Sequence, residues 1–240
     1  MIQDAKQKNN IVYNFRTFYV IIYHASRQYM FNKIKTFIEA KRIVNNWNYV
    51  FEHNPEIEKI GSRQEYIEYT QTIFPDSVLK KVCFHGGKKG IDKFLKPSDP
   101  NFRKNKGANS GTKDYGIYFT TDKAIAKTYL KGYKRQDRQM YSVMVDIKKP
   151  LINNGFFALH IRKKFNDNIL NPQSITSKDY ERLKQSGYDS IIWQGDNGEV
   201  IVFQPEQIHI LGTEEDLNKF KQYKQNKLMS QIITTTRIYE

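Results

Sequence analysis

The first 75 residues place hydrophobic side chains three or four positions apart, which is the spacing of an amphipathic helix. The apolar positions that follow this spacing are Phe15, Phe18, Ile22, Met30, Ile34, Phe37 and Ile38. No glycine or proline interrupts the chain before Pro55. The pattern therefore predicts two or three helices in residues 1–75.

After residue 75 the pattern changes to short apolar runs between polar segments, which is typical of strands. We expect strands over residues 78–84, 117–120, 140–147, 190–193, 199–203 and 208–211. We expect helices over residues 122–130 and 177–186, and a further helix that begins at Thr213. Because strands and helices do not alternate regularly, this order predicts an α+β domain over residues 76–212. A helical N-terminal region (1–75) and a C-terminal helical tail (213–240) would flank it.

The expected strand over residues 78–84 leads into His85, Gly86 and Gly87, which the pattern places in a loop. Two glycines let a ligand approach backbone amides with no side chain in the way. A plain surface turn is the alternative interpretation. The segment lacks the Gly-Lys-Ser/Thr ending of a Walker phosphate loop, and the chain has no Gly-x-Gly-x-x-Gly fingerprint between a strand and a helix.

Two tyrosines and one glutamate stand out among the later elements. Tyr118 lies on the strand over residues 117–120, and Tyr129 lies on the helix that follows it. Such a pair can enclose a flat heterocycle, although aromatic residues at a strand-to-helix corner are commonly part of the core. Glu199 begins an apolar strand after a polar loop, where a carboxylate is either functional or protects the strand from aggregation.

The chain has 39 Lys and Arg residues against 25 Asp and Glu residues, a formal net charge of +14. Such a positive charge attracts nucleic acid, acidic proteins, anionic membrane surfaces or phosphorylated small molecules. The net charge alone does not show which of these partners binds. More than half of the excess lies in residues 80–113, of which 97–111 should form an exposed loop.

Cysteine and histidine usage narrows the chemistry further. The single cysteine, Cys83, excludes an intramolecular disulfide and a multi-cysteine zinc site. The histidines outside the His85 motif are scattered, so we propose no metal site. The apolar run at residues 18–23 is shorter than the roughly 20 residues that span a bilayer, so we expect a soluble intracellular protein.

Three segments taken together resemble the ADP-ribosyltransferase superfamily, in the His-Tyr-Glu branch that includes diphtheria toxin and the poly(ADP-ribose) polymerases. They are Cys83-Phe84-His85-Gly86-Gly87, then Gly116-Ile117-Tyr118-Phe119-Thr120 with Tyr129, then Gly198-Glu199-Val200-Ile201-Val202-Phe203. The resemblance spans residues 78–212 and implies a split antiparallel β-sandwich core. Residues 187–192 and 203–208 are similar to the small transferase domains of bacteriophage and mobile-element polyvalent proteins.

The resemblance implies that NAD is the co-substrate and assigns parts of it to particular residues. His85 would bind the adenosine ribose, and the backbone of Gly86 would pair with the nicotinamide carboxamide. Tyr118 and Tyr129 would stack on the two sides of the nicotinamide ring. Lys88 would bind the pyrophosphate, with Lys89 and Lys93 as alternatives.

The same resemblance implies a catalytic set of Glu199, His85 and Tyr129, in which Glu199 holds the 2'-hydroxyl of the nicotinamide ribose. Two positions depart from the family pattern. Asn197 replaces the first member of the Glu-x-Glu or Gln-x-Glu pair of transferases that modify arginine or asparagine. Ala126 occupies a position where polymerase-like members often carry a serine that binds the carboxamide.

These features favour a glycosyltransferase that makes a single transfer, a mono-ADP-ribosyltransferase that modifies a host protein or nucleic acid. As a toxin or effector of bacterial or bacteriophage origin, it would act in the bacterial cytoplasm or travel in a virion. Its N-terminal helices would choose the acceptor or dock the protein in a larger assembly, and we expect no membrane partner. Two alternatives stay open. One is a catalytically inactive basic module that binds nucleic acid or belongs to a virion, and the other is an NAD glycohydrolase.

Overall fold

The structure is a computed structural model that describes residues 32–33, 36–95, 116–153, 177–193 and 198–236. The predicted exposed loop at residues 97–111 and Asn197 lie outside the described residues. The chain divides into two compact units, residues 1–45 and 46–240. In the first unit, residues 32–33 and 36–45 are helical. The second unit carries every candidate residue named above that the structure describes.

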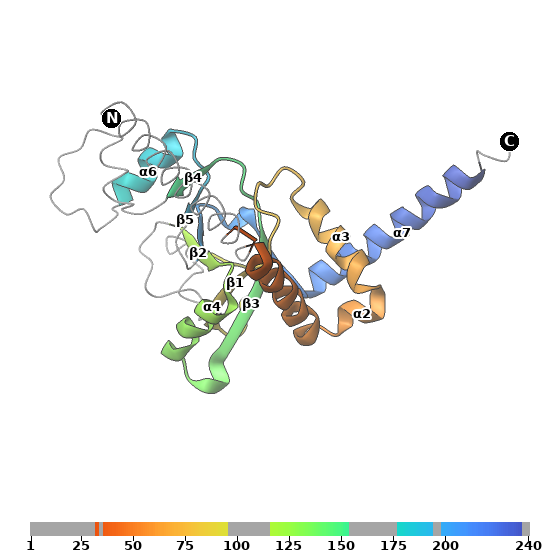
Figure 1. The fold of residues 1–240 in the computed structure, drawn as a ribbon, viewed down its shortest axis with the longest axis horizontal. Coiled ribbons are helices and arrows are strands. Elements are labelled where there is room, and N and C mark those ends of the chain that lie inside the picture. Colours follow the sequence, from red (N-terminus) through yellow and green to blue (C-terminus); the bar gives the residue numbers. More distant parts are fainter. Residues whose placement is uncertain (1–31, 34–35, 96–115, 154–176, 194–197, 237–240) are drawn as a thin grey trace, which may run out of the picture. The chain divides into compact units, whose positions relative to one another are not determined.

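A seven-stranded sheet in the order β4-β5-β6-β2-β1-β3-β7 forms the centre of the second unit (Figure 1). The strands are β1 (Cys83–Lys88), β2 (Ile117–Thr120), β3 (Arg138–Val145), β4 (Pro150–Asn153), β5 (Ser190–Trp193), β6 (Glu199–Val202) and β7 (Ile208–Ile210). Neighbouring strands are antiparallel except β4 and β5, which are parallel. Edge strand β4 begins at Pro150, a position where proline needs to donate no ladder hydrogen bond.

The sheet is weakly joined between β1 and β2. Among the described residues, these two strands pair at Phe84 and Thr120 only. In contrast, β1 pairs with β3 along its whole length, from Cys83 to Lys88. The sheet thus consists of a β4-β5-β6-β2 half and a β1-β3-β7 half, which agrees with the split core that the resemblance implied.

Helices surround this sheet in the order that the hydrophobic pattern predicted. Residues 46–53 are helical and are followed by α2 (Glu56–Ile60), α3 (Arg63–Ile73), α4 (Lys123–Tyr129), α6 (Ser177–Gln185) and α7 (Glu214–Thr236). The short 3₁₀ helices are η1 (Leu130–Gly132), η2 (Arg135–Asp137) and η3 (Pro205–Gln207). Asp122 caps α4 by accepting a hydrogen bond from the backbone of Ala124. No helix in the described part of the chain is long and apolar enough to cross a membrane.

Apolar side chains cover both faces of the central strands. Along β3, Tyr141, Val143 and Val145 belong to one buried cluster, whereas Met144 belongs to another that includes the helix of residues 46–53, α2, α3 and α7. Figure 1 shows α2 and α3 beside the base of α7. The helices that precede the sheet in the sequence, and the helix that follows it, therefore form one core with the sheet.

One strand prediction was wrong. Strand β1 begins at Cys83 instead of residue 78, and it continues through His85, Gly86 and Gly87, which we had placed in a loop. Consecutive glycines favour turns locally, but here the pairing of His85 with Tyr141 and of Gly86 with Met140 in β3 determines the backbone. The histidine and the two glycines therefore lie on a central strand. The structure also contains a strand, β4, that the hydrophobic pattern did not predict.

The position of Cys83 gives a first testable prediction. Its side chain is fully buried, and burial raises the pKa of the thiol to about 12. Because the thiolate is the reactive form, we expect Cys83 of the folded protein to react with a disulfide reagent at least about 10³-fold more slowly than in denaturant. Absorbance of the released thiol at pH 8 measures both rates. Similar rates would contradict the placement of Cys83 in the core.

Candidate active site

The narrow join between β1 and β2 brings the predicted site residues together. His85 and Gly86 lie on β1, Tyr118 on β2, Tyr129 at the end of α4 and Glu199 at the start of β6. The Nδ1 atom of His85 lies 2.8 Å from the carbonyl oxygen of Tyr118. The hydroxyl of Tyr129 donates to Oε1 of Glu199 over 3.2 Å.

The hydrogen bond to Tyr118 fixes the protonation of His85. A carbonyl oxygen only accepts, so Nδ1 must carry the proton and Nε2 of the neutral ring is left as an acceptor. The side chain is only 5% exposed, and burial lowers the pKa of His85 below its ordinary value, against a smaller opposing effect of the Tyr118 carbonyl. A Cβ at Gly87 would lie 3.1 Å from Nε2, so the glycine leaves room beside this atom.

The lowered pKa of His85 predicts an acid limb in the NAD-dependent activity that the resemblance implies. Protonation of Nε2 would remove the acceptor, so kcat/KM should fall on the acid side with an apparent pKa below 6.5. Because the folded-state pKa lies below the unfolded one, the contribution of His85 to stability is complete above pH 6.5 and declines as the pH falls below it. A pH profile of NAD consumption tests this. In His85→Gln the residual activity should lack that limb, and an unchanged limb in the variant would assign it to another group.

Gly86 lets α4 pack directly on the backbone of β1. A Cβ at this position would overlap the carbonyl oxygen of Ala126 and would also contact Leu130. Any larger residue would therefore push α4 away from the sheet, and with it Tyr129. The glycine of the His85 motif thus has a packing reason that is visible in the structure.

Glu199 and Tyr129 form the polar part of the site. Glu199 pairs with Thr120 of β2, and Gly198 before it has φ +52°, a conformation that favours glycine. A Cβ at Gly198 would also overlap Oγ1 of Thr121, so both backbone conformation and space favour glycine beside Glu199. Tyr129 is 56% exposed, and partial burial followed by the charge of Glu199 raises its pKa. Tyr129 therefore stays a hydrogen-bond donor to the carboxylate.

Tyr118 lies beside another tyrosine, and Lys88 lies at the end of β1. The hydroxyl of Tyr118 lies 3.2 Å from that of Tyr180 on α6, and its ring packs against the cluster that contains Tyr180 and Phe203. Tyr118 is also close enough to raise the pKa of Tyr129. Lys88 ends β1 opposite Arg138 and is half-buried.

Two residues that hold the site in place, Asn46 and Tyr180, were not predicted. Asn46, which is 5% exposed, donates from Nδ2 to the carbonyl oxygen of Thr121 over 3.0 Å. The backbone of Thr121 in turn donates to the carbonyl of Gly198. Tyr180 is buried beside Tyr118. Both residues lie far from their partners in the sequence and match no motif, so local patterns could not have identified them.

A comparison with known families gives a match over the part of the chain that carries these residues. The family model described as "ADP-Ribosyltransferase in polyvalent proteins" matches residues 79–216, more than half of the chain. The match runs from before β1 to the first turn of α7 and so includes all the candidate residues. None of the curated proteins compared with the chain matches it. The chain therefore belongs to the family of ADP-ribosyltransferases in polyvalent proteins.

Proposed function

We propose that the protein is an NAD-dependent mono-ADP-ribosyltransferase that modifies a macromolecule. The reaction breaks the bond between nicotinamide and C1' of its ribose and forms a bond from that carbon to a nucleophile of the acceptor. Nicotinamide leaves with the bonding electrons, and the acceptor nucleophile loses its proton. The observation that carries the proposal is the contact of Tyr129 with Glu199 beside the join between β1 and β2.

Glu199 is proposed to stabilise the charge that develops when the glycosidic bond breaks. Cleavage of such a bond passes through an oxocarbenium-like state, which a nearby carboxylate favours. A preorganised group of this kind typically contributes about 3–4 kcal/mol to the barrier reduction. The hydrogen bond from Tyr129 and the glycine conformation at Gly198 would keep the carboxylate in position.

The remaining residues suit the parts of NAD. Nε2 of His85 is an acceptor suited to a ribose hydroxyl, and the exposed ring of Tyr129 offers a flat face to the nicotinamide. Tyr118 would complete the aromatic surroundings, and the backbone of Gly86 would bind the carboxamide. Lys88 at the end of β1 is the proposed partner of the pyrophosphate.

The proposal also covers the number of transfers, the acceptor, and the cell or particle in which the protein acts. Ala126, in place of a carboxamide-binding serine, would leave the carboxamide to the Gly86 backbone and lower the affinity for NAD. The sequence shows no feature that supports chain elongation, so we propose one transfer per site. The acceptor would be a host protein or nucleic acid, modified by a bacterial or bacteriophage effector in the bacterial cytoplasm or after delivery in a virion. Residues 1–75 would select the acceptor or dock the protein, residues 76–212 would catalyse, and residues 213–240 would form a helical tail.

Incubation of the purified protein with NAD labelled in the adenosine part and with bacterial lysate tests the proposal. We expect label on a macromolecule together with an equal amount of released nicotinamide. Nicotinamide with free ADP-ribose and no labelled macromolecule would replace the transferase with an NAD glycohydrolase. No nicotinamide at all would contradict both activities and favour the inactive nucleic-acid-binding module.

A further inference from the structure

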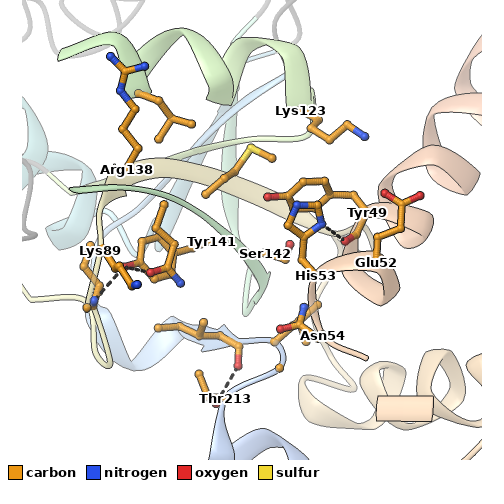
Figure 2. Close-up of a pocket in the computed structure, with 18 of the residues that line it drawn as sticks. Tyr49, Glu52, His53, Asn54, Lys89, Lys123, Arg138, Tyr141, Ser142 and Thr213 are labelled. Carbon is orange, nitrogen blue, oxygen red and sulfur yellow. Dashed lines mark hydrogen bonds between the residues drawn. The ribbon is translucent and has the colours of Figure 1, made fainter. Parts of the chain in front are cut away.

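A cavity in the described part of the chain has a lining different from the candidate active site. Its volume is about 690 Å³, and its walls come from the helix of residues 46–53, the segment 89–92, α4, β3 and residues 210–213 (Figure 2). Its lining includes none of His85, Gly86, Tyr118, Tyr129 and Glu199. The proposed chemistry therefore leaves this cavity unexplained.

Different residues of helix α4 face the cavity and Glu199. Lys123 and Lys127 line the cavity together with Leu130, just after the helix, at the i, i+4 and i+7 positions of one helical face. Tyr129 is two positions from Lys127, about 200° around the helix, and contacts Glu199 instead. A ligand in the cavity would thus meet α4 on the side that faces away from Glu199.

Positive charge dominates the lining. Lys89, Lys123, Lys127 and Arg138 contribute cations, whereas Glu52 and Asp92 contribute carboxylates. Within the described part of the chain, Lys89, Lys123 and Lys127 form no ion pair. The ammonium group of Lys123 lies 5.0 Å from the centre of the Tyr49 ring. Cations gathered around a concave surface, with no carboxylate paired to these three lysines, attract an anionic ligand.

The other groups in the lining indicate a ligand larger than a single inorganic anion. Ligand pockets typically have volumes of about 300–1,000 Å³, which is far more than a phosphate ion fills. The exposed ring of His53 stacks on Tyr49 with 3.8 Å between the ring centres and offers a flat surface. The carboxylates of Glu52 and Asp92 are acceptors for sugar hydroxyls or base amino groups.

We infer that this cavity binds a nucleotide, with its phosphate near Lys123 and Lys127 and its base near His53. The same chemistry is present in a free mononucleotide and in one unit of a single-stranded nucleic acid. This inference does not depend on the transferase proposal, because that proposal gives no role to Lys123, Lys127 or His53.

Calorimetric titration of the full chain with adenosine monophosphate, inorganic phosphate and single-stranded oligoadenylate tests the inference. We expect the monophosphate to bind, and the double variant Lys123→Gln/Lys127→Gln to weaken it about tenfold or more because two charged contacts are lost. The matched control Lys219→Gln/Lys221→Gln removes the same charge from α7 and should bind like the wild type. Thermal unfolding of all variants checks that they fold.

Each further outcome decides between sources or overturns the inference. Oligoadenylate that binds more tightly than the monophosphate, with the same loss in the Lys123/Lys127 variant, would identify a strand as the source. The reverse order would identify a free nucleotide. Unchanged monophosphate binding in this variant, or inorganic phosphate binding as tightly as the monophosphate, would overturn the inference. Loss of monophosphate binding in Glu199→Gln would also overturn it, because the ligand would then occupy the active site.

Discussion

Replacement of Glu199 by glutamine is expected to lower kcat for ADP-ribose transfer about 10²–10³-fold, with a KM for NAD within a few-fold of the wild type. Glutamine has the shape of glutamate and can still accept a hydrogen bond from Tyr129. It lacks the charge that would stabilise the oxocarbenium-like state. The loss should therefore appear in kcat, because the charge acts mainly in the transition state.

Glu206→Gln is the matched control for this variant. Glu206 is an exposed residue of η3, a few residues beyond β6, and the same change of charge there should leave kcat unaltered. Initial rates of nicotinamide release over a range of NAD concentrations separate kcat from KM. Equal kcat values for the two variants would remove Glu199 from the chemical step.

The largest effect on stability is expected from Asp216→Ala. The Asp216 carboxylate is fully buried near the start of α7 and accepts hydrogen bonds from the hydroxyls of Tyr66 and Tyr69, the backbone of Gly212 and Nε2 of His209. Burial, and then the charge of Asp216, raise the pKa values of both tyrosines, so both phenols remain donors.

Alanine at position 216 would leave these buried donors without their shared acceptor. Loss of one member of a buried charged network typically costs about 3–5 kcal/mol, and we expect the free energy of unfolding to fall by that amount. Urea unfolding followed by circular dichroism measures it. Glu215→Ala is the control, because Glu215 is exposed and pairs with Lys219 only one turn away, so its loss should cost less than about 1 kcal/mol. Equal losses for the two variants would show that the buried network does not stabilise the fold.

The local hydrophobic pattern predicted most helices and strands, because the periodicity of each segment matches the structure that it forms. The strand over residues 117–120 and the helix that ends before Gly187 both depend on neighbours in the sequence. The pattern failed at β1, where Gly86 and Gly87 favour a turn locally but pair with β3 about 50 residues later. Long-range pairing of this kind has no local signal.

The candidate active site could also be predicted only in part from the sequence. The resemblance named His85, Tyr129 and Glu199, and the structure adds the tautomer of the histidine and the contact between the other two. It also adds Asn46, whose role follows only from the docking of its helix against Thr121. Sequence motifs can identify residues that meet a substrate, whereas the residues that position them depend on the tertiary structure.

The most direct test of the central claim is mass spectrometry of the modified acceptor after reaction of the wild type and Glu199→Gln with NAD. We expect each modified position on the wild-type product to gain the mass of one ADP-ribose unit, and Glu199→Gln to give little or no such product in the same time. Chains of several units would contradict single transfer. Equal product from both proteins, or no modified acceptor at all, would contradict the proposed transferase.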